Sequence, residues 1–307
     1  MASLPPSLPI RVNVAHKMDD DRVVAISTDG EIVVIESDLQ SFSQPKTPFP
    51  ASITNSVVIG NKLIATWLSH EFREARMACV DLDNLEDGIS KSELRLSQSS
   101  EQTPQVSGAI WSKSLNAEPL AMAKIPNGVA FVLWKRGIYA ITVEADELWR
   151  SEHITWDEKY PRFNEIISMN SDHQNLYIWS KGGGWKILEN ETGDVVSMGK
   201  KEFEWTLKNT HMHKKMKLFL QENNKIILLD GNEFVSTGIV KGPTSYTVFD
   251  HDMNSWRIAG WRQEMLLGNK VQQTVENDEI LVFTIKINDG WLNLANSGEW
   301  NHSLLTV

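Results

Sequence analysis

Cysteine, long apolar runs and helical periodicity are all scarce in this chain of 307 residues. Cys79 is the only cysteine, which excludes an internal disulfide and is typical of a protein in a reducing compartment. The longest apolar runs, such as 129–134, fall far short of the roughly 20 residues that a membrane-spanning helix needs. The start of the chain lacks the basic and apolar regions of a secretory signal. The sequence therefore predicts a cytoplasmic protein that does not enter a membrane.

The chain also has few positive charges: it contains 30 basic and 40 acidic residues, which gives a net charge of −10. A protein with this balance repels the phosphate backbone of nucleic acids at long range. The basic segment 214–217 is short, and only His211 and His213 lie next to it. We therefore expect no nucleic-acid partner.

One pattern recurs along the chain: an extended apolar segment, a polar turn and a second extended apolar segment. In the first copy, the turn contains Asp29 and Gly30, and Asp-Gly between apolar segments is a strong hairpin signal. The pattern occurs seven times, pairing 22–27 with 31–35, 62–67 with 75–80, 129–134 with 138–143, 176–179 with 185–188, 217–220 with 225–229, 256–261 with 264–267, and 280–285 with 291–294.

A further extended segment precedes most of these hairpins, and another follows several of them. Four strands per unit, repeated about every 40 residues, is typical of a β-propeller blade. We therefore predict an all-β fold, a single β-propeller domain over residues 1–307 with about seven four-stranded antiparallel blades. The last two hairpins are closely spaced, so a six-bladed ring is the alternative. The polar segment 86–116 is predicted to be an exposed insertion that is most mobile at 97–105.

Two segments carry a resemblance to known propellers. The strand that contains Tyr139 and Ala140 leads through a turn to Leu148 and Trp149, and this segment resembles the repeat of quinoprotein (PQQ-like) propellers. The Thr-Gly turn within 189–196 is similar to the turn of the same repeat. The repeat is also similar in kind to WD40-like propellers, but it lacks their Gly-His and Trp-Asp signature, so no specific family is identified. The resemblance implies the superfold and no catalytic quinone role.

A candidate metal site is centred on His211 and His213. If both residues lie on a strand, the two-residue period places both imidazoles on one face, where they could hold a metal ion together. Their position before the fifth hairpin predicts an innermost strand facing the central channel. A third ligand would come from Asp250, Asp252 or His16. The alternative is that both histidines are ordinary polar residues on a solvated channel wall.

The twelve tryptophans fall into recognisable groups. Four of them close the first strand of a hairpin, and we expect them to pack between neighbouring blades: Trp67, Trp134, Trp179 and Trp261. Four others fall outside the hairpins, and one or two of these are expected to be exposed, as interface aromatics are: Trp149, Trp156, Trp205 and Trp300.

No catalytic motif is present, and the sequence does not indicate a cofactor. The favoured prediction is therefore a non-enzymatic propeller that binds another protein, as a scaffold or as a subunit of a complex. The alternative is a metal-dependent hydrolase or lyase whose site lies in the central channel and contains His211, His213 and nearby carboxylates.

Overall fold

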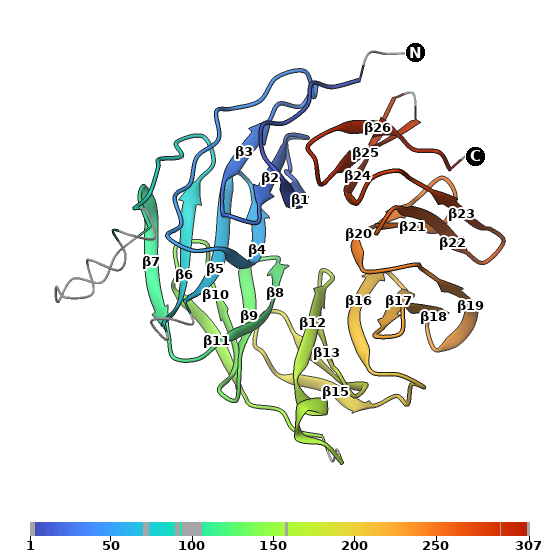
Figure 1. The fold of residues 1–307 in the computed structure, drawn as a ribbon. Coiled ribbons are helices and arrows are strands. Elements are labelled where there is room, and N and C mark those ends of the chain that lie inside the picture. The colour runs from blue at the N-terminus through green and yellow to red at the C-terminus, as the bar shows by residue number, and fades with distance from the viewer. Residues whose placement is uncertain are drawn as a thin grey trace.

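The computed structural model describes residues 4–69, 74–89, 93, 106–156, 159–288 and 290–305. In these residues, seven antiparallel sheets are arranged around a ring (Figure 1). Five of the described sheets have four strands, and the first and the last in the chain have three. The all-β propeller prediction is confirmed with seven blades, and the six-bladed alternative is wrong.

Each blade begins at the ring axis and adds its strands outward. The inner strands are β1 (Val12–Lys17), β4 (Ile53–Ile59), β8 (Pro119–Ile125), β12 (Ile166–Ser171), β16 (Leu207–His213), β20 (Thr244–Asp250) and β24 (Leu281–Ile287). The second strands are β2 (Val23–Ser27), β5 (Lys62–Ser69), β9 (Gly128–Leu133), β13 (Asn175–Ser180), β17 (Met216–Gln221), β21 (Ser255–Gly260) and β25 (Gly290–Ala295).

The two outer positions of each blade follow in the same order. The third strands are β3 (Ile32–Ile35), β6 (Glu74–Asp81), β10 (Gly137–Ile141), β14 (Gly184–Glu189), β18 (Lys225–Asp230), β22 (Gln263–Gly268) and β26 (Trp300–His302). The outermost strands, in blades 2 to 6, are β7 (Ala109–Leu115), β11 (Glu147–Glu152), β15 (Val195–Lys200), β19 (Glu233–Ile239) and β23 (Gln272–Glu276). A 3-10 helix, Pro161–Asn164, lies between β11 and β12. The described part of the chain has no helix that could cross a membrane.

The burial of the strands follows their position in the blade. All five residues of β2 and all six of β9 are buried, because a second strand packs against neighbouring blades on both of its faces. In the outermost strand β23, exposed and half-buried residues alternate, since this strand lies at the rim. The Asp29-Gly30 turn forms as predicted, and Gly30 adopts a positive φ of 89° that glycine accepts without steric cost.

Six of the seven predicted hairpins are the second and third strands of a blade. The seventh, formed by β24 and β25, is instead the first and second strands of blade 7. The seventh hairpin therefore begins one strand earlier in its blade than the other six do. This explains why the last two hairpins are close together in the sequence although they belong to separate blades.

The segment 86–116, predicted as an insertion, contains an element of the fold. Its last part is β7, which pairs with β6 and completes blade 2. Its first part is held against blade 1, where the Gly88 N–H donates to the Thr47 carbonyl at 2.8 Å. An outermost strand has a solvent-facing side, so its polar residues look like those of a loop. Residues 97–105 lie outside the described residues, and their mobility stays a prediction.

Apolar clusters fill most of the interfaces between neighbouring blades. The interface of blades 4 and 5 holds the smallest of them, with Trp179, Leu207, Phe219 and Leu229 as its buried members. The interface of blades 6 and 7 is crossed by buried polar side chains. There the Arg257 Nε donates to the Asp250 Oδ2 at 2.8 Å, and both side chains are only 2% exposed.

The ring closes between the first and last blades. The Leu8 N–H donates to the Gly298 carbonyl at 3.0 Å, and the Val12 N–H donates to the Asn296 carbonyl at 2.9 Å. Leu8 and Ile10 are buried in one cluster with Phe283 and other residues of blade 7. The N-terminal segment therefore lies at this junction (Figure 1), whereas the last described residues contact blade 6, where the Leu304 N–H donates to the Glu264 carboxylate.

Candidate functional site

The predicted histidine pair lies on the inner strand β16, as the order of the hairpins indicated. His211 and His213 share one face of this strand, and that face is turned toward blade 6. The His211 ring lies 6.2 Å from the Trp256 ring, and the His213 ring stacks on Phe249 with ring centroids 4.1 Å apart. His251 lies against the same His213 ring at 4.7 Å. The two histidines therefore lie between two blades.

The expected third ligands have partners of their own. Asp250 binds Arg257, Asp252 binds Lys286, and the His16 Nε2 lies 2.8 Å from the Ser56 Oγ in blade 2. Within the described residues, no group of three or more His, Cys, Asp or Glu side chains is placed to hold a metal ion. The metal site at His211 and His213 stays a prediction.

Two half-buried imidazoles predict how stability depends on pH. Burial lowers the pKa of His16 and of His211 from 6.5 to about 4. Between these values the unfolded chain binds protons that the folded chain does not, so stability is complete above pH 6.5 and falls as the pH drops toward 4. We expect a loss of about 1–2 kcal/mol per histidine between pH 7 and pH 5.

Urea unfolding at pH 7 and pH 5 measures this difference. In the variant His16→Gln with His211→Gln, the difference between the two pH values should shrink. The matched control is His173→Gln at an exposed turn, which should leave the difference as it is. If the native protein, the double variant and the His173→Gln control lose the same stability between pH 7 and pH 5, the prediction is contradicted.

The tryptophans at the hairpin ends divide into buried and exposed pairs. Trp67 and Trp179 are paired within the strand ladder and are buried, as predicted. Trp134 and Trp261 are each 49% exposed, so the prediction that they pack between blades is wrong. The second strand of the first of these hairpins ends its pairing at Leu133, opposite Gly137, and that of the other ends at Gly260, opposite Gln263. Trp134 and Trp261 each come one residue after this last paired residue and therefore lie in the turn.

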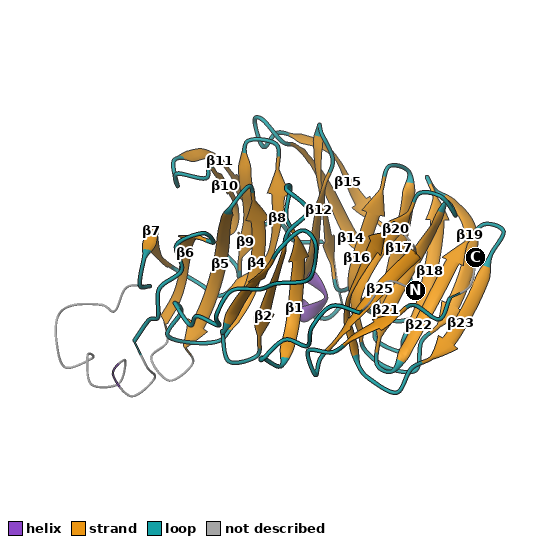
Figure 2. Cartoon of the chain, turned by 90° about the horizontal axis from the view of Figure 1, so that it is seen from above, coloured by secondary structure: helices purple, strands orange, loops and turns teal. Residues whose placement is uncertain are grey.

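Two further exposed aromatic residues lie on the same side of the ring. Strands alternate in direction, so the turns between second and third strands share one face with the connections between blades (Figure 2). Trp205 lies in the connection from β15 to β16 and is 52% exposed, whereas Trp149, Trp156 and Trp300 are buried. Tyr160, in the connection from β11 to β12, is also half exposed. We call Trp134, Tyr160, Trp205 and Trp261 the aromatic face.

Basic side chains accompany the aromatic face. The Lys135 ammonium lies 4.6 Å from the centre of the Trp134 ring, and the Lys159 ammonium lies 5.4 Å from the Tyr160 ring. Arg262 follows Trp261 directly in its turn. Among the four tryptophans at the hairpin ends, the exposed Trp134 and Trp261 are each followed by a basic residue. The buried Trp149 and Trp256 are also followed by arginine, so this pattern alone does not identify an exposed turn.

Comparison with known proteins shows what this fold is similar to. No family model and no curated protein sequence matches the chain. Among solved structures, the β-propeller domain of Cps50 (Swd1) from Myceliophteria thermophila matches with a TM-score of 0.67 and 9% identity, over 97% of this chain and 98% of that one. BamB from Moraxella catarrhalis matches with a TM-score of 0.58 and 10% identity, over 94% and 82%.

A third similar structure is the computationally designed Ika8 protein, with a TM-score of 0.62 and 7% identity over 97% of each chain. The first of the three is a WD40 propeller, and BamB is a PQQ-like propeller. These are the two kinds of repeat that the sequence resembles, so the predicted superfold is confirmed. At these identities the likeness concerns the fold alone.

Proposed function

We propose that this propeller is a non-enzymatic scaffold, or a subunit of a complex, that binds another protein through its aromatic face. One observation carries the proposal: four large aromatic side chains are about half exposed, and all of them lie in turns or connections on one face of the ring. Exposed tryptophan and tyrosine are enriched at protein interfaces, where they supply much of the binding energy. Strands on both sides hold these turns, so little conformational freedom is lost on binding.

The overall net charge of −10 supports a protein partner over nucleic acid, because it repels a phosphate backbone at long range. The acidic turn 18–22, with Asp19, Asp20 and Asp21, joins the first and second strands of blade 1 and lies on the face opposite the aromatic face. Lys135 and Lys159 lie beside the aromatic face, which suits an acidic patch on a protein partner. The proposal includes a cytoplasmic location, in keeping with the buried free thiol of Cys79.

Site-specific crosslinking in cells of the source organism tests the proposal. A photoreactive amino acid at position 134 or at position 261 should capture the same protein. The matched control places it at position 191, an exposed turn on the opposite face, which should not capture that protein. Capture of the same protein at position 191 alone, or of none at positions 134 and 261, would contradict the proposal.

Replacing the two turn tryptophans gives a quantitative result. Trp134→Ser with Trp261→Ser should lower the affinity for the captured protein at least tenfold, because truncation of an aromatic anchor commonly costs more than about 1 kcal/mol each. Stability should change by only about 1 kcal/mol in total, since both rings are half exposed. Calorimetric titration and urea unfolding measure the two quantities. Unchanged affinity would show that the partner binds elsewhere.

A further inference from the structure

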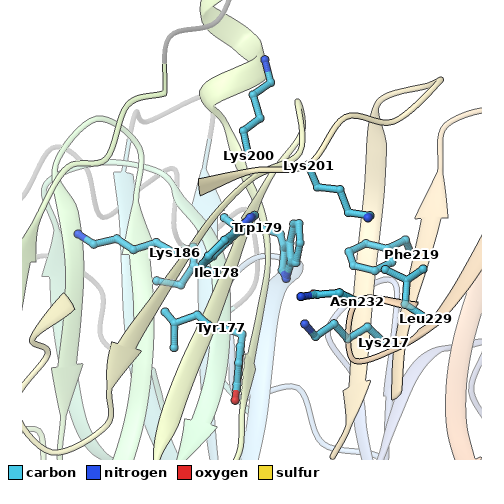
Figure 3. Close-up of a pocket in the computed structure, with 12 residues that line it drawn as sticks. Tyr177, Ile178, Trp179, Lys186, Lys200, Lys201, Lys217, Phe219, Leu229 and Asn232 are labelled. Atoms are coloured by element: carbon cyan, nitrogen blue, oxygen red, sulfur yellow. The ribbon is translucent and has the colours of Figure 1, made fainter. Parts of the chain in front are cut away.

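The interface between blades 4 and 5 contains a cavity as well as the smallest apolar cluster of the ring. The cavity has a volume of about 440 Å³ and lies between the strands of β13 and β14 on one side and β17 and β18 on the other (Figure 3). We call it the blade 4–5 pocket. Pockets that hold small molecules typically have volumes of roughly 300–1,000 Å³.

Aromatic and apolar side chains form the walls of this pocket. On blade 4, Trp179 is paired with Trp185 across the ladder, so both rings lie on the face turned toward blade 5. On blade 5, Phe219 meets Trp179 edge to face with ring centroids 4.8 Å apart. Gly199 lies opposite Trp185 in the ladder, and a Cβ at that position would come within 2.8 Å of the Trp185 ring. The absence of a side chain at Gly199 keeps this wall open.

Nitrogen-bearing side chains surround the same walls. Figure 3 shows Lys201, Lys217 and Asn232 around the rings, while Lys186 extends away to the other side of its blade. The Lys186 Nζ lies 3.4 Å from the Ser151 Oγ of blade 3, which agrees with that direction. Burial lowers the pKa of Lys217, and the positive charge of Lys201 lowers it further. None of the described lining residues is an Asp or a Glu.

Two cations that line an aromatic pocket without a lining carboxylate favour the binding of a negative charge from elsewhere. This arrangement is unusual in a chain of net charge −10, where carboxylates outnumber cations. Flat rings such as Trp179 and Trp185 pack well against a planar group. We infer that the blade 4–5 pocket binds a small molecule that combines an aromatic ring with an anionic group, either a carboxylate or a phosphate.

In this arrangement, the planar part of the ligand packs against the half-buried Trp185 ring, beside Trp179 and Phe219, which are in contact with each other. Its anionic group accepts charge-assisted hydrogen bonds from Lys217 and Lys201, and Asn232 can donate a further hydrogen bond. The site is separate from the aromatic face, and it does not depend on the proposed protein partner.

Calorimetric titration of the whole protein with three probes tests the inference. Adenosine monophosphate carries a phosphate, indole-3-acetate carries a carboxylate, and adenosine is the uncharged counterpart. At low salt, at least one of the two anions should bind at least tenfold more tightly than adenosine. Binding of adenosine monophosphate alone assigns the anion as a phosphate, and binding of indole-3-acetate alone assigns it as a carboxylate.

Lysine variants show whether binding occurs in this pocket. Lys217→Met keeps the length of the side chain, removes its charge and should weaken anion binding at least tenfold; Lys201→Met provides a second variant outside the strands. The matched control is Lys208→Met, an exposed lysine that does not line the pocket, which should bind the anions as the native protein does. Absence of binding by both anions at millimolar concentration would overturn the inference. Equal affinity for adenosine, or undiminished affinity in both pocket variants, would also overturn it.

Discussion

Replacing Arg257 with methionine is expected to lower the free energy of unfolding by about 3–5 kcal/mol, because it breaks a buried ion pair and leaves a buried carboxylate without its cation. The Arg257 guanidinium binds Asp250 within blade 6 and donates to the Ser303 Oγ of blade 7 at 3.2 Å. It also lies 4.5 Å above the Trp291 ring of blade 7. One side chain thus joins two neighbouring blades, and urea unfolding measures its contribution.

A second ion pair on the same two blades provides the control. Lys286 binds Asp252, but both side chains are about half exposed or more. Lys286→Met should therefore cost at most about 1 kcal/mol. Adding Asp250→Asn to Arg257→Met should recover part of the loss, since the remaining buried charge is removed while the amide oxygen can still accept from the turn N–H groups. Equal losses for Arg257→Met and Lys286→Met would contradict the account.

Deleting residues 1–11 is expected to open the ring and to cost about 4 kcal/mol or more. The deletion removes Leu8 and Ile10, which are each 4% exposed, and truncating a buried aliphatic side chain costs roughly 2–5 kcal/mol. It also removes the hydrogen bond from the Leu8 N–H to the Gly298 carbonyl, so the buried apolar side chains of blade 7 lose part of the segment that packs on them. Thermal unfolding measures the loss, and light scattering should detect aggregation through the uncovered apolar surface.

The control is the deletion of residues 1–4, which ends with the exposed Leu4. This shorter variant should melt within a degree or two of the native protein. The double substitution Leu8→Ala with Ile10→Ala keeps the backbone bond and should lie between the two deletions. A 1–11 deletion that melts like the native protein would show that the ring closes without this segment.

Blade number and strand order could be predicted from the sequence because their causes are local. The Asp29-Gly30 turn and the fully apolar second strands act within one hairpin, and a repeat of about 40 residues multiplies the same signal. The inner-strand position of His211 and His213 followed from this order alone. The strand β7 was missed because its polar residues suit both a rim strand and a loop.

The orientation of particular side chains could not be predicted in the same way. A shift of one residue relative to the ladder places Trp134 and Trp261 in a turn but Trp67 and Trp179 inside a blade interface, and hydrophobicity does not reveal such a shift. The blade 4–5 pocket depends on side chains from two different blades. Lys217 looked like part of a short basic segment, and only its position opposite Trp179 and Trp185 identifies it as a binding residue.

The junction between blades 1 and 7 also determines how this protein must be made. The cluster that closes the ring joins Leu8 and Ile10 to residues 282–300, almost the entire length of the chain away. A ribosome that adds roughly 5–20 residues per second needs about 15 s to 1 min to synthesise the stretch between them. During that time one apolar side of the first blade has no partner. The nascent chain therefore exposes this apolar surface until the last blade leaves the ribosome.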